Sequence, residues 1–168
     1  MKLFINLLLV CVLSLGFTAA QAQSKLAHIN TEDLFSAMPE TKKMEKDVQN
    51  AAQAYDADYK SQVTALEVKL QKYDQEAAFQ TETENQKRAL EVEELKSKLQ
   101  VFAQQAQQKI QKKQYDLYKP IETKAVNAIK HVAAEKGFDY VLDSSNGKGL
   151  IVFDGEDILA AVKARLGI

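Results

Sequence analysis

A long, regular alternation of apolar and polar positions runs through the middle of the chain. No glycine or proline occurs between Thr41 and Tyr118. In the first half of this stretch, ten apolar or small positions take nine steps over 33 residues, about 3.67 residues per step. This 11-residue repeat predicts one long helix with a single apolar seam, nearly straight or slightly right-handed in its coiling. The seam positions are Met44, Val48, Ala52, Tyr55, Tyr59, Val63, Leu66, Leu70, Tyr73 and Ala77.

A second seam follows, out of phase with the first. The break falls in residues 79–86, where Thr81 and Glu84 form a capping-box pattern that would start a new helix near Glu82. We therefore expect an antiparallel hairpin of two helices, each of about 40 residues or about 60 Å; one continuous rod is the alternative. The second seam consists of Leu95, Leu99, Phe102, Ala106, Ile110, Leu117 and Ile121.

The chain after the second seam predicts a change of structure. Pro120 predicts a kink or a restart of the helix, which would then end at Gly137 as its C-terminal cap. Residues 138–153 predict a β-hairpin, because Asn146-Gly147 favours a two-residue type I′ turn. That turn would pair Leu142 with Ile151 and Tyr140 with Phe153.

Short elements are expected at both ends of the mature chain. Residues 25–30 predict a strand that covers one edge of the hairpin. The next segment predicts a short helix that is capped by Thr31 and ends before Pro39. A last helix would be capped by Asp154 and would end at Gly167.

These elements predict an α+β protein with two parts. The arm is the helical hairpin, residues 41–119, and the body is a small β-containing unit formed by residues 23–40 and 120–168. A body this small is marginally stable by itself, and its sheet exposes an edge that favours pairing with another chain. We therefore expect an obligate oligomer, held together by the second apolar face of the hairpin. The candidate interface residues are Val141, Leu150 and Val152.

Residues 1–22 have the three-part pattern of a secretory signal peptide, with Ala20-Gln21-Ala22 at the cleavage site. An uncleaved membrane anchor and a lipid anchor at Cys11 are the alternatives. Cys11 is the only cysteine, so the mature chain has no thiol for a disulfide or a metal site. Its net charge of −2, from 21 basic and 23 acidic residues, offers no general attraction to nucleic acid. An exported protein without cysteine fits the bacterial periplasm.

The sequence offers little for catalysis or cofactor binding. His28 and His131 have no spacing typical of a metal site. Residues 147–149 lack the pattern of a phosphate-binding loop, and Ser144-Ser145 has no base nearby in sequence. We expect no catalytic, cofactor-binding or metal-binding residues, and we expect that the protein is not an enzyme.

Several segments resemble the OmpH/Skp family of periplasmic chaperones. They are "KLAHINTEDLF" (25–35), "MPE" (38–40), the restart at Pro120 and, above all, "EKGFDYVLD" (135–143). The resemblance covers essentially the whole mature chain. It implies a homotrimer with a β-barrel-like body and three helical-hairpin arms, around a cavity that holds unfolded outer-membrane proteins without ATP.

Two features depart from that family's usual pattern. His28 stands where an apolar or aromatic strand residue is usual, and the arm has 14 basic and 13 acidic residues, a net charge of only +1. The weak charge puts binding to anionic lipid or lipopolysaccharide in doubt.

Four hydrophobic residues far from the seams are the candidate contacts for an unfolded client protein. A holdase gains retention from many weak contacts, because multivalency replaces a single tight site. Chance surface hydrophobes, or packing at the arm tip, are the alternative explanation. The candidates are spaced 11 residues apart: Val68, Phe79, Leu90 and Val101. The function that we expect is an ATP-independent holdase for unfolded outer-membrane proteins; a structural coiled-coil spacer or adaptor of the cell envelope is the alternative.

Overall fold

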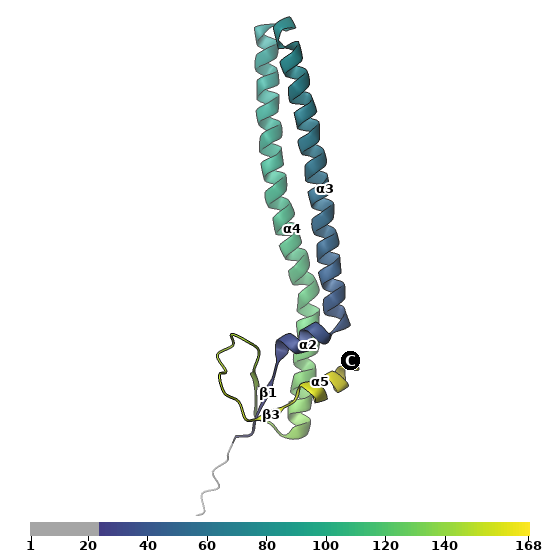
Figure 1. The fold of residues 1–168 in the computed structure, drawn as a ribbon, viewed down its shortest axis with the longest axis vertical. Helices are drawn as coiled ribbons and strands as arrows, with labels where there is room; N and C mark the ends of the chain where they lie inside the picture. The colour runs from purple at the N-terminus through teal and green to yellow at the C-terminus, as the bar shows by residue number, and fades with distance from the viewer. Residues whose placement is uncertain (1–23) are drawn as a thin grey trace, which may run out of the picture.

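The structure, a computed structural model, describes residues 24–168 and shows a long two-helix arm rising from a small body (Figure 1). The predicted signal peptide therefore lies outside the described residues. The elements in chain order are β1 (Leu26–Ile29), α2 (Thr31–Ala37), α3 (Pro39–Glu76), the 3-10 turn η1 (Ala77–Phe79), α4 (Glu82–Lys136), β2 (Tyr140–Asp143), β3 (Glu156–Asp157) and α5 (Leu159–Leu166). The expected α+β class, with a helical-hairpin arm on a small body that contains strands, is confirmed.

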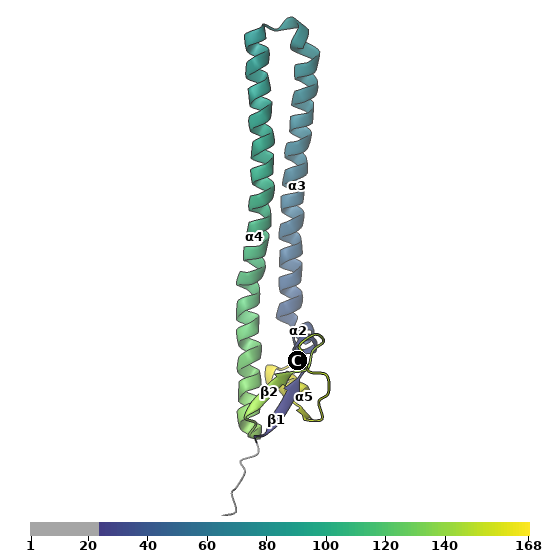
Figure 2. The ribbon, with the colours of Figure 1, turned by 90° about the vertical axis from the view of Figure 1, so that its left-hand side faces the viewer.

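The arm consists of α3 and the upper part of α4, which run side by side in opposite directions (Figure 2). The chain reverses at η1, so the continuous rod is excluded. Thr81 caps α4 as predicted, since its side chain accepts a 3.2 Å hydrogen bond from the backbone N–H of Glu84. The predicted seams face each other, with the rings of Tyr55 and Phe102 6.3 Å apart.

Helix α4 continues through Pro120, so a restart of the helix there is wrong, while a kink within the continuous helix stays a prediction. A proline inside a helix removes one backbone hydrogen bond and costs about 3 kcal/mol. Packing offsets this cost, because the same face of α4 contacts α3 in the arm and the hydrophobic core in the body. Leu117 packs above the proline, and Ile121 and Ala125 are buried below it. The helix ends where the sequence predicted, with Gly137 at φ 71° as its cap.

The small sheet has the order β2-β1-β3, and both neighbours run parallel to β1. The predicted antiparallel hairpin is therefore wrong, although a turn does form at its centre. Lys148 donates a 3.3 Å backbone hydrogen bond to Ser145, and Gly147 has φ 78°. Asn146, however, does not have the positive φ that a type I′ turn requires at both central positions. The chain therefore continues as a loop, and the N-terminal strand occupies the centre of the sheet instead of its edge.

Two of the predicted helix caps are also corrected. Asn30, one residue before Thr31, caps α2 by accepting a 3.1 Å hydrogen bond from the backbone N–H of Asp33. Asp157, not Asp154, accepts a 2.8 Å hydrogen bond from the N–H of Leu159 at the start of α5. Thr31 is not the cap because it is already the first residue of α2, and its hydroxyl donates instead to a side chain of the sheet, described below.

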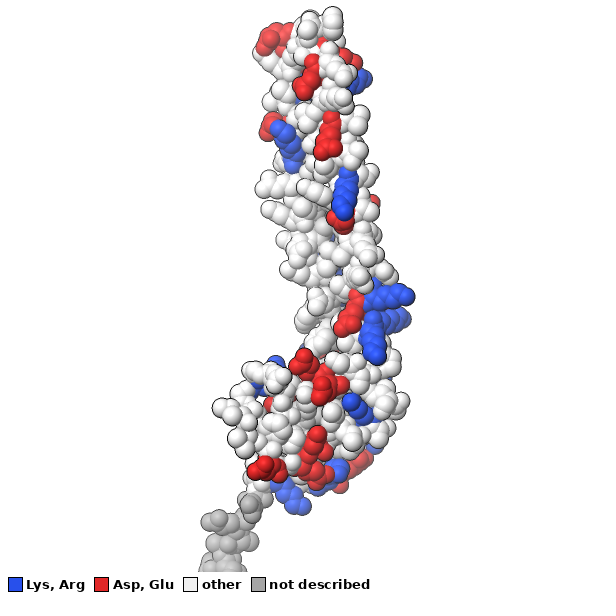
Figure 3. Space-filling model, in the orientation of Figure 1, with Lys and Arg blue, Asp and Glu red and all other residues white. Residues whose placement is uncertain are grey.

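The middle of the arm has no charged side chains on either helix. Residues 48–55 of α3 and 99–108 of α4 contain only apolar residues, alanine, glutamine and asparagine. The Tyr55–Phe102 contact places these two stretches side by side. Figure 3 shows a paler band across the arm, with acidic and basic side chains mingled toward the tip and basic side chains gathered low on the arm.

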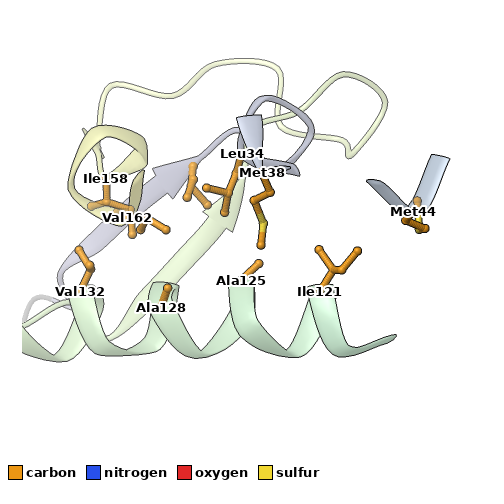
Figure 4. Packing of buried hydrophobic residues seen from close by; sticks show 11 residues of the cluster. Leu34, Met38, Met44, Ile121, Ala125, Ala128, Val132, Ile158 and Val162 are labelled. Atoms are coloured by element: carbon orange, nitrogen blue, oxygen red, sulfur yellow. The ribbon is translucent and has the colours of Figure 1, made fainter. Parts of the chain in front are cut away.

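The core of the body lies between the lower part of α4 and the elements that cover it (Figure 4). Leu34, Met38, Ile158 and Val162 are fully buried over α4, and burial of each such side chain contributes about 1.5–3 kcal/mol. Figure 4 shows them above a helix face that carries two alanines, Ala125 and Ala128, which allow close approach. Helix α4 therefore belongs to the arm through its upper part and to the core of the body through its lower part.

Candidate functional site

The four candidate client contacts on the arm are all exposed in the structure. Val68 is 61% exposed, Phe79 86%, Leu90 72% and Val101 47%. None of them packs into the seam between α3 and α4, so their spacing in the sequence placed them correctly on the outside of the arm. Their contact with a client stays a prediction.

These four residues do not form one surface. At about 100° per residue, Leu66 and Leu70 of the seam each lie about 160° around α3 from Val68, so Val68 points away from α4. Leu90 bears the same relation to Arg88 and Val92 of α4, and therefore points away from α3. Val68 and Leu90 occupy opposite edges of the arm, with Phe79 at the tip between the two helices.

A polar network near the tip fixes the two helices relative to each other. Glu91 of α4 accepts hydrogen bonds from Lys69 and, at 2.5 Å, from the hydroxyl of Tyr73. Arg88 lies with its guanidinium carbon 4.5 Å from the centre of the Tyr73 ring and donates a 2.9 Å bond to Glu76. The hydrogen bonds from Lys69 and then Tyr73 lower the pKa of Glu91. The carboxylate therefore stays ionised and keeps both bonds at neutral pH.

One face of the sheet is apolar and largely open to solvent. Leu26 and Leu142 are exposed on this face, together with Tyr140. The loop of residues 144–155 adds three further exposed hydrophobes, Ile151, Val152 and Phe153. An exposed patch of this kind, on a body this small, is typical of a surface that another chain covers.

Only one of the three candidate interface residues belongs to that exposed patch. Val141 is half-buried and packs against the core of its own body, and Leu150 is half-buried in the loop. Only Val152 is exposed. The expectation grouped them through the antiparallel hairpin; in the parallel sheet Val141 instead faces inward.

Asp143 lies at the end of β2 and joins three elements of the body. Its carboxylate accepts hydrogen bonds from the hydroxyl of Thr31 at 2.7 Å and from the hydroxyl of Ser145 at 2.7 Å, and further bonds from the backbone N–H groups of both residues. Partial burial alone would raise the pKa of Asp143, but these four bonds outweigh it and lower the pKa to about 2. The cluster stabilises the fold, and nothing in the sequence pattern signalled it.

His28 lies next to this cluster without becoming part of a catalytic arrangement. It is buried in β1, its Nδ1 is 3.3 Å from the hydroxyl oxygen of Ser144, and its ring lies 4.6 Å from that of Phe153. The carboxylate of Asp143 bonds to Thr31 and Ser145 and not to His28, so the three residue types of a serine hydrolase are present without their relay. Within residues 24–168, no group of three His, Cys, Asp or Glu side chains could hold a metal ion, and no helix is long and apolar enough to cross a membrane.

Comparison with known proteins identifies the family. The family described as "Outer membrane protein (OmpH-like)" matches residues 25–166, which include the whole arm and the whole sheet. The chain belongs to the OmpH-like family. The resemblance that the sequence suggested is therefore confirmed.

Curated relatives of this OmpH-like chain carry the name "Chaperone protein Skp". The protein of that name from Vibrio cholerae is 28% identical over 146 residues, covering 83% of this chain and 82% of the relative. The one from Pectobacterium atrosepticum is 23% identical, covering 81% of this chain and 86% of the relative. A solved structure of an OmpH-like protein from Caulobacter crescentus has a TM-score of 0.73 at 16% identity, and covers 86% of this chain and 85% of that one. This structural likeness confirms the OmpH-like fold.

Proposed function

We propose that this OmpH-like chain is a periplasmic holdase chaperone, which binds unfolded outer-membrane proteins between helical arms and prevents their aggregation without ATP. The family and the chaperone names of its relatives support the proposal. The protein is exported by the signal peptide of residues 1–22, and it binds its clients without catalysing a reaction.

The observation that carries the proposal is the form of the arm. Five of its exposed large hydrophobes lie outside the seam and are separated from one another by polar side chains, whereas a sixth, Tyr59, belongs to the seam; the five are Val68, Phe79, Leu90, Val101 and Tyr115. Such an arm offers shallow apolar contacts that an unfolded chain can occupy and leave. Many weak contacts give retention without a tight site, which suits a protein that must later release its client.

The open face of the sheet supports an assembly, and we propose a homotrimer. Tyr140 and Leu142 belong to an apolar face that a single chain leaves in water. Three copies that cover these faces would bring three arms to one side and enclose a cavity between them. We also propose the division into a trimerisation body (23–40 and 120–168) and an arm (41–119). Helix α4 runs through both parts without a break.

A structural spacer or adaptor of the envelope is the competing function. An adaptor would bind one folded partner with fixed stoichiometry, whereas a holdase accepts unrelated unfolded chains. The assay is the turbidity of a urea-unfolded outer-membrane β-barrel protein diluted into buffer with the mature chain. Suppression of aggregation for several unrelated barrels, equal with and without ATP, supports the holdase. Failure to suppress aggregation of any of them contradicts it.

A further inference from the structure

The side of α4 that points away from α3, its outer edge, carries a longer row of exposed apolar residues than the 11-residue spacing predicted. Besides Leu90 and Val101, Tyr115 is 63% exposed and Val126 is 39% exposed. At about 100° per residue, all four side chains project within about 40° of one another. Between Leu90 and Val126 the helix rises 36 residues, or about 54 Å. The row therefore follows α4 from near the tip of the arm down to the body.

This row lies opposite the face that α4 buries. Val92, Ala106 and Ile121 are buried in the seam or the core, and they lie about 160–220° around the helix from Leu90. No other part of the described chain packs on the row. Packing in the seam or in the core explains the other large apolar side chains of α4, but it does not explain this row.

The outer edge of α3 is different in character. The exposed positions that point away from α4 project within about 80° of one another, and Val68 is the only large hydrophobe among them. The others are small, polar or basic: Lys43, Lys46, Asn50, Gln53, Ala57, Ser61, Thr64, Gln71 and Gln75. The two edges of the arm therefore present different surfaces.

The two helices also differ in net charge. Residues 109–130 of α4 hold six lysines and two acidic residues, a net charge of +4. A stretch of the same length at the start of α3, residues 39–60, holds four lysines and five acidic residues, a net charge of −1. Lys112 and Lys119 lie three residues before and four residues after Tyr115, so they flank it on the same edge. Each already pairs with an acidic residue of α4, Lys112 with Asp116 at 2.8 Å and Lys119 with Glu122 at 2.7 Å, and such exposed pairs are weak enough for a second carboxylate to compete. Tyr115, Lys119 and Lys124 also line an open, shallow hollow beside Pro120.

We propose that the outer edge of α4 is the surface that faces the client, and that its lower half around Tyr115 takes acidic stretches of the unfolded chain. This inference rests on the proposed holdase function. An unfolded polypeptide can lay apolar side chains on Leu90, Val101, Tyr115 and Val126 while its carboxylates meet Lys112 and Lys119. The outer edge of α3, with Val68, then faces away from the client.

Photo-crosslinking locates the client on the arm. Benzoylphenylalanine is placed singly at Val101 or Tyr115 on α4, and at Ala57 or Val68 on α3 as matched controls. Each mature variant is mixed with a urea-unfolded, acidic outer-membrane β-barrel protein and irradiated. We expect strong cross-links from the two α4 positions and weak ones from the α3 positions. Equal or stronger cross-links from α3 overturn the inference.

Charge neutralisation tests the acidic partner. The double variant Lys112→Gln, Lys119→Gln is compared with Lys42→Gln, Lys46→Gln, which removes the same charge from exposed positions of α3; glutamine keeps the helix in both. We expect the α4 pair to raise the Kd for the unfolded barrel about tenfold and to reduce its salt dependence. The α3 pair should change the Kd less than about twofold. Equal effects of the two pairs on the Kd for the unfolded barrel overturn the inference. So does a result in which the α4 pair weakens binding to anionic lipid vesicles but leaves the Kd for the unfolded barrel unchanged.

The holdase function and the assignment of the client to the α4 edge fail in different ways. If the wild-type protein neither suppresses aggregation nor cross-links anywhere, the holdase function fails and the inference fails with it. If it suppresses aggregation but the α3 edge cross-links, only the inference fails. Circular dichroism detects any variant that loses helicity. Only variants with the helicity of the wild type are then used to compare cross-linking from α4 and α3.

Discussion

The hydroxyl of Thr31 donates a 2.7 Å hydrogen bond to Oδ2 of Asp143, and this bond joins residues that are 112 positions apart. It ties the start of α2 to the end of β2. The same carboxylate accepts the hydroxyl of Ser145, so it also fixes the beginning of the loop that carries Ile151 and Val152. One side chain thus positions the helix that leads into the arm and the loop on the open face of the sheet.

The variant Asp143→Asn should lower the stability of the body by about 1–2 kcal/mol at neutral pH. The pKa of Asp143 is lowered from 3.8 to about 2 by folding, so the ionised carboxylate stabilises the native state above about pH 4. This contribution is lost as the pH falls through about 2. Urea unfolding at several pH values should show a wild-type advantage at pH 7 that shrinks between pH 4 and pH 2. An advantage that does not change with pH would show that the charge is not what stabilises.

The variant Glu91→Gln should loosen the tip of the arm. Glu91 joins the helices by accepting from Lys69 and Tyr73 of α3, whereas Glu94 pairs only with Lys98 of its own helix. Backbone amide hydrogen exchange should therefore accelerate near the tip in Glu91→Gln and stay unchanged in the control Glu94→Gln. Exchange in the body should not change in either variant. Equal acceleration in both variants would remove the network's role.

Charges placed on neighbouring residues of β2 should have different effects. Leu142→Glu places a charge on the open face, so we expect a folded chain that no longer assembles. Val141→Glu places a charge against the core of the same chain, so we expect a loss of at least about 2 kcal/mol of stability. Light scattering and circular dichroism distinguish the two outcomes. Normal assembly of Leu142→Glu would show that the open face is not the interface.

Replacing Val68, Phe79, Leu90 and Val101 together by serine should weaken client retention without unfolding the arm. All four side chains are exposed, so their removal costs little packing. The thermal midpoint and helicity should match the wild type, while the unfolded barrel is released faster. Early melting would instead mean that these side chains pack on another part of the assembly.

The arm could be predicted from the sequence because its determinants are local and repeated. An 11-residue apolar period fixes the seam, and Thr81 and Gly137 signal the helix ends through their own side chain and backbone. The exposure of Val68 and Leu90 followed from the same period. Their placement on opposite edges required the identity of the partner helix face, which the period of one helix does not give.

The body could not be predicted in the same way, because its determinants join distant residues. Asn146-Gly147 favours a hairpin locally, but β1 pairs with β2 on one side and β3 on the other. Both pairings are parallel, and parallel pairs need long connections that a local pattern does not reveal. Pro120 misled for a related reason, since burial of Ile121 and Ala125 keeps the helix intact against the local preference.

We expect the assembled arms to hold an unfolded chain in solution. This expectation is tested most directly by light scattering on a complex formed when a urea-unfolded outer-membrane β-barrel protein is diluted into the mature protein. We expect a soluble species with the mass of three chains and one client, in which circular dichroism shows no β-barrel, and we expect it to form equally without ATP. A monomeric chain that leaves the barrel to aggregate, or a complex only with the folded barrel, would contradict the account.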